Sequence, residues 1–198
     1  MNIFLETERL ILRQFSEDDA DNLFELDRDR EVMRFINGGT PTDYDVIQQE
    51  RLPRILSFYQ VYEHYGIWAV VEKSSNIFIG WFHFFPAREI AYVAELKLGT
   101  DDDIALGYRL RQSHWGKGYA TEGSRMLVDQ GFSNWNIQRV ISWALVMNKA
   151  STRVMEKVGL KLEKEFMFTE KHLPSLQPSE RKAVKYALGA KLVSSRVN

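Results

Sequence analysis

The stretch RLRQSHWGKGYATEG, residues 109–123, constrains the fold more than any other part of the chain. Gly116 and Gly118 stand one residue apart, at the point where a strand pattern gives way to a helix pattern. Glycine costs a helix about 0.5–1 kcal/mol relative to alanine, so two glycines near a helix start need a reason. The first backbone N–H groups of a helix lack internal partners and carry partial positive charge. The pattern therefore predicts either a cradle for a phosphate group or a tight turn with nothing bound.

Hydrophobic periodicity on both sides of this turn predicts alternating strands and helices. We expect strands at about residues 4–14, 66–72, 77–85, 103–110 and 139–145, and two more that begin near residues 159 and 181. We expect helices at about residues 17–28, 43–63, 87–96, 118–133 and 149–158, with a further helical turn at REVMRFI. Pro53 should kink the second of these helices or split it in two. This order indicates an α/β fold in which helices cover a mixed sheet.

Size and composition limit the classes of protein to which the chain can belong. Its 198 residues suit a single domain, residues 1–198, with a full hydrophobic core. A net charge of −1 disfavours a dedicated nucleic-acid binder, which normally carries a basic excess. The chain has no cysteine, which excludes a disulfide framework, a thiolate zinc site, an iron–sulfur cluster and a cysteine nucleophile.

The sequence also bears on location and on metal binding. The N-terminal MNIFLETERLILRQF carries charges every few residues, unlike the apolar core of a signal peptide. No window of the chain approaches the ~18 apolar residues of a membrane span. The four histidines show no metal-ligand spacing. We therefore expect a cytoplasmic protein with no metal site.

Three blocks of sequence resemble one known superfamily. The glycine turn lacks the lysine and serine of a Walker loop and the third glycine of a dinucleotide-binding turn. Together with the preceding GYRL, it resembles the pyrophosphate-binding motif of the GNAT acetyltransferase superfamily. The segment NKASTRVMEKVGL, residues 148–160, resembles the next GNAT motif nearly position for position. ETERLILRQFSEDDADNLFEL and EVMRFI resemble the opening of the Rim-type branch, whose members acetylate protein N-termini.

The resemblance covers most of the chain and implies both a fold and a co-substrate. The implied fold is a single GNAT-like domain with a mixed, mostly antiparallel sheet, flanking helices and a central strand pair that splays apart. Acetyl-CoA would lay its pantetheine arm along the backbone of residues 108–111 and its pyrophosphate on the amides of residues 115–119. The residues that the resemblance assigns to the cofactor are Tyr108, Arg109, Leu110, Arg111, Trp115, Gly116, Lys117, Gly118, Tyr119, Ala120, Asn148 and Ser151.

Several of these assignments have a structural alternative. Lys117 either adds charge beside the phosphates or is an exposed turn lysine. Asn148 either contacts the cofactor or only caps the helix that follows, since asparagine is a favoured N-cap residue. Arg111 or Arg153 is a candidate for the remaining phosphate, on grounds of charge alone. Ser151 is either a catalytic residue that hydrogen-bonds the leaving thiolate or a serine that bonds backbone at the helix start.

The sequence departs from the Rim-type branch at the general base. Members of the branch commonly carry a glutamate two residues before GY, where this chain has Ala105. Asp103 would lie on the same face of a strand, and is either a catalytic base that acts through water or a turn aspartate. Met155 stands where many GNAT enzymes have a tyrosine acid. Glu95 and His83 are further base candidates without positional support.

The resemblance implies that an acetyl group passes from acetyl-CoA to a primary amine by direct attack in a ternary complex. An α-amine has a pKa of about 7.7–8.0 and is substantially neutral near pH 7, whereas a lysine at about 10.4 is not. We therefore expect the α-amine of a protein or peptide as acceptor. The alternatives are a small-molecule amine, a non-catalytic acyl-CoA sensor and a nucleotide-phosphate binder. No nucleic-acid or membrane partner is expected, and a homodimer is compatible with the resemblance.

Overall fold

The computed structural model describes residues 2–190, and within them the chain divides into two compact units. Unit 1 comprises the chain up to His83 together with Tyr108–Gly123. Unit 2 comprises Phe84–Gly107 and the chain from Ser124 onward. The expectation of one domain over residues 1–198 stays a prediction.

The described residues contain one eight-stranded sheet. Its strands are β1 (Ile3–Glu6), β2 (Leu10–Arg13), β3 (Gly66–Glu72), β4 (Ile77–Pro86), β5 (Ile104–Leu110), β6 (Arg139–Leu145), β7 (Lys161–Met167) and β8 (Lys182–Gly189). They follow the order β1-β2-β3-β4-β5-β6-β8-β7. Of the pairs described within a unit, β5–β6 is parallel, and β1–β2, β2–β3, β6–β8 and β7–β8 are antiparallel. The predicted α/β fold with a mixed, mostly antiparallel sheet is confirmed.

The helices follow the predicted order closely. They are α1 (Ala20–Asp27), α2 (Arg30–Asn37), α3 (Tyr44–Val46), α4 (Leu52–Val61), α5 (Ala91–Glu95), α6 (Tyr119–Asn134) and α7 (Lys149–Val158). The segment predicted as a helix at 43–63 is helical from Tyr44 to Val61, and a π-helical turn at Ile47–Arg51 lies between α3 and α4, just before Pro53. Pro53 lies in the first turn of α4, where a missing N–H costs no hydrogen bond.

The single N-terminal strand predicted at residues 4–14 is wrong, because the segment forms two strands, β1 and β2. They pair with each other in antiparallel fashion, from Ile3–Arg13 to Glu6–Ile11. The turn between them is closed by the amide of Thr7, which donates to the Leu10 carbonyl at 2.9 Å. The Thr7 hydroxyl in turn accepts from the Leu10 amide at 2.9 Å. Four consecutive polar residues, ETER at positions 6–9, interrupt the hydrophobic pattern at this turn, and the prediction of one strand overlooked that break.

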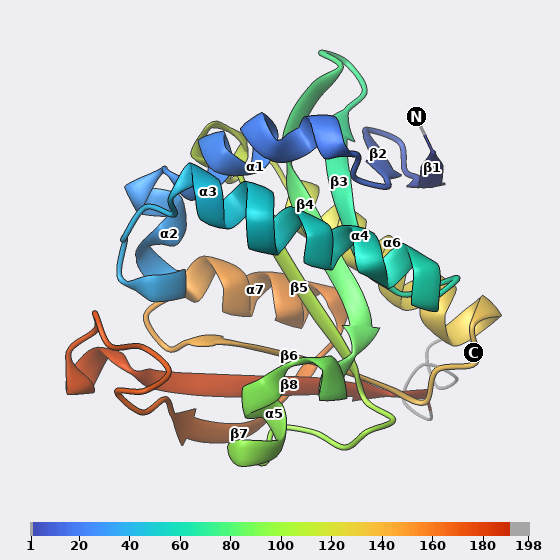
Figure 1. Cartoon of the computed structure of the whole chain (residues 1–198). Helices are drawn as coiled ribbons and strands as arrows, with labels where there is room; N and C mark the ends of the chain where they lie inside the picture. The colour runs from blue at the N-terminus through green and yellow to red at the C-terminus, as the bar shows by residue number, and fades with distance from the viewer. Residues whose placement is uncertain (1, 191–198) are drawn as a thin grey trace. The chain divides into compact units, whose positions relative to one another are not determined.

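Unit 1 has its own hydrophobic core. Helices α1 and α4 lie across β3 (Figure 1), and their apolar faces supply much of that core. The buried residues of the cluster are Phe15, Ala20, Leu23, Leu26, Val32, Ile47, Leu52, Ile55, Ala69 and Phe78. The Phe15 and Phe78 rings meet edge to face, with centroids 6.1 Å apart. Burial of these helix faces against the strands stabilises unit 1.

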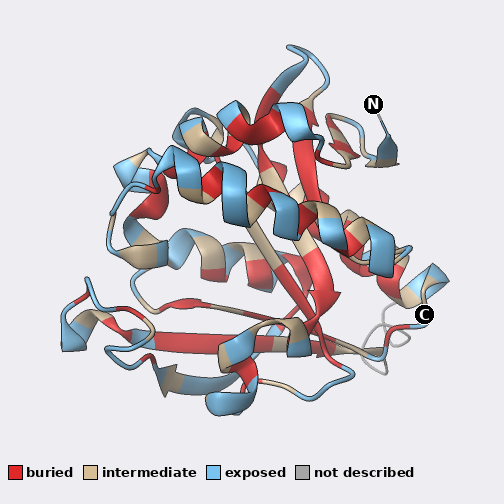
Figure 2. Cartoon of the chain, viewed as in Figure 1, coloured by how far each residue is buried: buried red, intermediate tan, exposed pale blue. Residues whose placement is uncertain are grey.

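Unit 2 is built around the pairing of β6 with β8, which runs over seven residue pairs from Arg139–Gly189 to Leu145–Ala183. Strand β8 is buried along most of its length, whereas β7, at the end of the strand order, is largely exposed (Figure 2). The core cluster contains Ala87, Val93, Leu98, Ala105 and Ile141. The parallel ladder of β5 and β6 holds two residue pairs, Ile104–Val140 and Ala105–Ile141. Such a short ladder agrees with a strand pair that separates, as the resemblance predicts.

Candidate active site

The glycine turn of unit 1 has the backbone conformation that its sequence suggests. A short 3₁₀ turn, Gln112–His114, follows β5, and α6 begins at Tyr119. Gly116 and Gly118 have φ angles of 74° and 86°, in the left-handed region that side chains with a Cβ rarely adopt. A Cβ on Gly116 would meet no atom within 4 Å. The turn therefore needs glycine at position 116 for its backbone shape and leaves open space beside it.

The amides of this turn are available to a ligand. The Trp115 amide donates to the Gln112 carbonyl at 3.1 Å, so this predicted pyrophosphate donor is already engaged. Within residues 2–190, the amides of Gly116, Lys117 and Gly118 make no hydrogen bond. They stand directly before a helix of 16 residues, whose first N–H groups carry partial positive charge. Three consecutive free donors at such a position suit a phosphate group.

The charges along the turn suit a diphosphate as well. Lys117 is exposed. The Arg111 guanidinium lies over the ring of Phe78, 5.6 Å from its centroid. Its Nε is buried without a hydrogen-bond partner among the described residues. These cations and the free amides fit the pyrophosphate of acetyl-CoA, and no negative side chain lies within the turn itself from Gly116 to Gly118.

The resemblance implied that the backbone of the strand before the turn is free to bond the pantetheine arm, but part of it is already engaged. The Arg111 amide donates to the Ile79 carbonyl at 2.8 Å, and the Leu110 carbonyl accepts from Trp115 Nε1 at 2.8 Å. An added Cβ on Gly80 would lie 2.1 Å from the Arg109 carbonyl oxygen, so β4 and β5 approach closely here. The Arg111 amide and the Leu110 carbonyl are thus already hydrogen-bonded and the Arg109 carbonyl lies close against β4, while backbone contact of Tyr108–Arg111 with the pantetheine arm stays a prediction.

A buried charge cluster in unit 1 escaped the sequence analysis. Asp27, at the end of α1, is bonded by the guanidinium groups of both Arg51 and Arg109. The Asp27 side chain is 2% exposed and that of Arg109 is 10% exposed. Arg109 also lies over the Trp81 ring, 4.9 Å from its centroid. The sequence holds one indication of this cluster. Asp27 stands four residues after the buried Leu23 on the same helix face, and a charge buried there needs a partner.

In unit 2, Asn148 has the capping role that the sequence left open. Its Oδ1 accepts from the Ser151 amide at 3.2 Å, at the start of α7. Ser151 therefore lies in the first turn of this helix, as predicted. Met155, one turn later, is 1% exposed and part of the packing. The cap explains the asparagine by itself, and contact of Asn148 or Ser151 with the cofactor stays a prediction.

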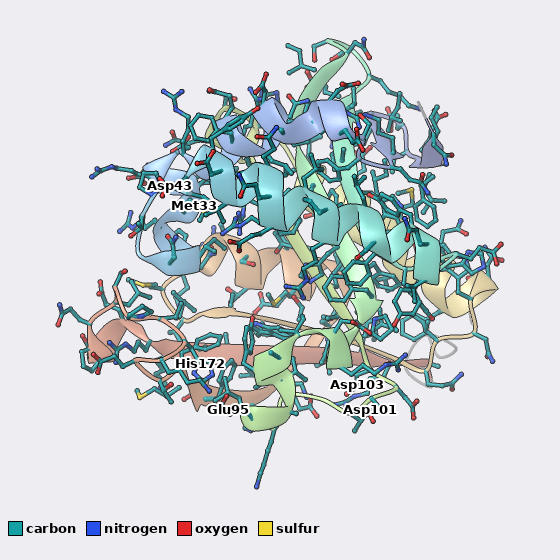
Figure 3. All side chains as sticks on the ribbon, viewed as in Figure 1. Met33, Asp43, Glu95, Asp101, Asp103 and His172 are labelled. Carbon is teal, nitrogen blue, oxygen red and sulfur yellow. The ribbon has the colours of Figure 1, made fainter. Side chains whose placement is uncertain are left out.

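Asp103 is held in a structural role. Its side chain is buried, and it accepts from Arg139 Nη1 at 2.9 Å and from the Thr100 amide at 2.9 Å. It thus closes the turn before β5, which is the turn aspartate that the sequence offered as alternative; Figure 3 labels its position. Ala105, at the position of the branch's glutamate, is fully buried. The catalytic role of Asp103 stays untested, but its carboxylate is already committed to Arg139.

The two remaining base candidates are no better placed. Glu95 on α5 bonds Lys171 Nζ at 3.0 Å and lies 3.5 Å from His172 Nε2, the pair labelled in Figure 3. The hydrogen bond from Lys171 holds the pKa of Glu95 below its usual range. Burial and the charge of Arg109 lower the pKa of His83 to about 3. Both are weak bases for an amine proton.

The described residues were also considered as a possible metal site and as a possible membrane-spanning segment. Among residues 2–190, no three histidine, aspartate or glutamate side chains are grouped so that they could hold a metal ion. In the same range, no helix has the length and apolar character that a membrane crossing requires.

Comparisons with known proteins identify the family of the chain. Residues 9–161 match the family model described as acetyltransferase (GNAT) domain. The uncharacterized N-acetyltransferase YoaA of Bacillus subtilis (strain 168) is 28% identical over 165 residues, covering 80% of this chain and 83% of YoaA.

Two solved structures show the same fold at low identity. RimL, a ribosomal L7/L12 alpha-N-protein acetyltransferase in complex with coenzyme A, superposes with a TM-score of 0.74 at 17% identity, over 95% of this chain and 98% of its own. Spermidine N-acetyltransferase from Vibrio cholerae, in complex with CoA and spermine, gives 0.70 at 16% identity, over 97% and 100%. The chain therefore belongs to the GNAT acetyltransferase family and is an acetyl-CoA-dependent N-acetyltransferase.

Proposed function

We propose that this N-acetyltransferase acetylates the α-amine of a protein or peptide. The observation that carries the proposal is the absence of a free carboxylate where the Rim-type branch commonly has its base. That position holds the buried methyl group of Ala105. The aspartate two residues earlier, Asp103, is paired with Arg139 at 2.9 Å. A site without a free carboxylate at this position favours an acceptor amine that is neutral without a general base.

The pKa of the acceptor amine determines how far its reaction depends on a general base. An α-amine with a pKa of about 7.7–8.0 is neutral in roughly one molecule in ten at pH 7. A lysine side chain at about 10.4 is neutral in fewer than about one in a thousand. General-base catalysis typically contributes about 10²–10⁴-fold, which is the size of the difference that a lysine acceptor would have to recover. An α-amine acceptor is thus the class that fits Ala105.

The co-substrate side of the proposal rests on the turn in unit 1. The free amides of Gly116, Lys117 and Gly118 would hold the pyrophosphate of acetyl-CoA, with Lys117 and Arg111 adding positive charge. Transfer would be direct, since the chain has no cysteine to carry an acyl group. In unit 2, the hydroxyl of Ser151 would donate a hydrogen bond to the departing thiolate, as the resemblance implies.

Membership of the Rim-type branch belongs to this proposal. It is supported by the N-terminal ETERLILRQF block and by the structural likeness to RimL. The spermidine N-acetyltransferase fold is about as similar, so the fold alone favours neither acceptor class. An α-amine acceptor is therefore favoured by the chemistry of Ala105 and Asp103, which leave no free carboxylate to act as a general base.

A panel of acceptors tests the proposal. Initial rates of thiol release from acetyl-CoA would be measured at pH 7 with two peptides of the same sequence. One has a free α-amine and no lysine, and the other has a blocked N-terminus and one lysine. We expect kcat/KM roughly two orders of magnitude higher for the free α-amine, in line with the neutral fractions. Spermidine and an aminoglycoside complete the panel, and faster turnover of either than of the free-α-amine peptide would contradict the proposal.

A further inference from the structure

The N-terminal ETERL block, residues 6–10, contacts the glycine turn through Arg9. Arg9 lies just before β2, more than a hundred residues from the glycine turn in sequence, and both belong to unit 1. Its Nη1 donates to the carbonyl of Lys117 at 3.0 Å, in the middle of that turn. Its guanidinium also lies over the ring of Tyr119, 4.5 Å from the centroid.

The bond to Lys117 fixes the direction of an amide. The Lys117 carbonyl and the Gly118 N–H belong to one planar trans peptide unit, so they point in opposite directions. With the carbonyl held by Arg9, the Gly118 N–H points away from the guanidinium. It is one of the three amides that make no hydrogen bond within residues 2–190. A Cβ on Gly118 would lie at ordinary contact distance, 3.4 Å, from Arg9 Nη2, so Arg9 lies directly beside this residue of the turn.

Arg9 is itself held firmly. Its Nε donates to Glu122 Oε2 at 2.6 Å and its backbone amide donates to Glu122 Oε1 at 3.0 Å. The Thr7 hydroxyl donates to the same Oε1 at 2.5 Å. The carbonyl of Arg9 accepts from the Lys73 amide at 2.9 Å. The backbone bonds hold the main chain of Arg9, and the partly exposed guanidinium is oriented by its contacts with Glu122, the Lys117 carbonyl and the Tyr119 ring.

Arg9 also offsets a charge that would disfavour an anion. Glu122 lies in the first turn of α6, one turn beyond the free amides. Burial alone would raise its pKa, but hydrogen bonds from Thr7 and Arg9 outweigh burial and lower the pKa of Glu122. The carboxylate is therefore ionised, and the contact with Arg9 at 2.5 Å neutralises it beside the diphosphate position.

We propose that Arg9 is a positioning residue for the diphosphate of acetyl-CoA: it orients the Gly118 amide through the Lys117 carbonyl and neutralises Glu122. This inference rests on the proposed pyrophosphate site at the glycine turn. It gives the ETERL block a role in donor recognition, since Thr7 and Arg9 together hold the first turn of α6. It also predicts that the effect of Arg9 depends on whether the acetyl donor carries a diphosphate.

Two acetyl donors separate this role from a merely structural one. Acetyl-CoA and S-acetylpantetheine share the thioester and the pantetheine arm, but S-acetylpantetheine lacks the pyrophosphate. For Arg9→Gln, we expect kcat/KM with acetyl-CoA to fall about tenfold, mainly through KM, as loss of a hydrogen bond to a charged group would give. kcat/KM with S-acetylpantetheine should stay within about twofold of the wild type. Arg9→Lys keeps the charge but cannot bond both partners, and should recover only part of the loss.

The control is Arg13→Gln, in the same strand segment. Arg13 bonds Asp19 at 2.6 Å, so its loss weakens unit 1 without touching the turn. It should lower stability, measured by thermal unfolding, and leave the ratio of the two donors at the wild-type value. An equal loss with both donors in Arg9→Gln and in Arg9→Lys would overturn the positioning role, as would no loss with either donor. A wild-type enzyme that turns over both donors equally well would instead overturn the diphosphate site itself.

Discussion

At the scale of single residues, charged groups in unit 1 are defined by the partners that the fold gives them. His83 on β4 stacks on Trp81, with ring centroids 5.8 Å apart. Burial and the positive charge of Arg109 lower the pKa of His83 to about 3, well below its usual value near 6.5. Arg109 is in turn bonded to the buried Asp27. The imidazole is therefore neutral at physiological pH, and its neutrality is linked to the stability of the fold.

The sign of that linkage gives a prediction. Below about pH 6.5 the unfolded chain takes up a proton on His83, whereas the folded chain excludes it until about pH 3. The unfolded state then binds more protons, so the contribution of His83 to stability is complete above pH 6.5 and falls as the pH drops from 6.5 toward 3. His83→Phe keeps the stacking on Trp81 and removes the titration. The residue retains intermediate exposure, so solvent will moderate the size of the effect.

Urea unfolding measured at pH 7, 5 and 4 for both proteins tests this prediction. The free energy of unfolding of the wild type should drop more steeply with falling pH than that of His83→Phe. Parallel curves for the two proteins would show that His83 protonates equally in the folded and unfolded chain, contrary to the assigned pKa.

Residue roles were predictable where a local rule applied, and not where a distant partner decides them. The cap at Asn148 and the turn at Asp103 follow from residue type and position, and the structure shows both contacts. The bond from Arg9 to the Lys117 carbonyl joins segments more than a hundred residues apart. No periodicity or capping rule reports such a pair, so Arg9 could be recognised as part of a motif while its partner could not be predicted.

Among the secondary-structure elements, most strands and helices were predictable from hydrophobic periodicity, because each presents one apolar face to a core. The strands expected at 66–72 and 139–145 and the helix expected at 149–158 match β3, β6 and α7. The failure at residues 4–14 has a physical cause. The turn between β1 and β2 is held by Thr7, whose hydroxyl also bonds Glu122 on α6. Four polar residues in a row, ETER at positions 6–9, are compatible with an exposed stretch of one strand as well as with a turn, and the tertiary contact of Thr7 selects the turn.

The glycine turn is the element on which donor binding depends. Gly116→Ala places a Cβ where φ is 74° but where no atom lies within 4 Å. The cost of the left-handed conformation, about 1–2 kcal/mol, should shift the turn and its free amides while the fold remains. We expect calorimetry to show about tenfold weaker acetyl-CoA binding.

Gly38 provides the matched control for this prediction. It caps α2 with a φ of 82°, so Gly38→Ala imposes similar backbone strain away from the turn. It should lower the midpoint of thermal unfolding to a similar degree and leave acetyl-CoA affinity at the wild-type value. Wild-type affinity in Gly116→Ala, with the strain evident in its unfolding, would remove the pyrophosphate from the turn.

At the scale of the whole molecule, the family was predictable because three ordered motifs recur at suitable spacing, and the match over residues 9–161 shows it. The acceptor was less accessible to sequence reasoning. Two N-acetyltransferases named for different acceptors, ribosomal protein L7/L12 and spermidine, share this fold at TM-scores of 0.74 and 0.70. Fold is thus common to proteins with different acceptors, so the acceptor class has to be argued from the side chains of the site, as proposed from Ala105.

The proposed transfer of acetyl to an α-amine rather than to a lysine can be tested with a single peptide. The peptide would carry a free N-terminus and a single internal lysine, so that both amines compete at equal concentration. After partial reaction with acetyl-CoA at pH 7, tandem mass spectrometry would locate the added acetyl group. Acetyl found almost entirely on N-terminal fragments is the predicted result. Acetyl found chiefly on the lysine would contradict the claim, because it would require a base that Ala105 and the paired Asp103 do not provide.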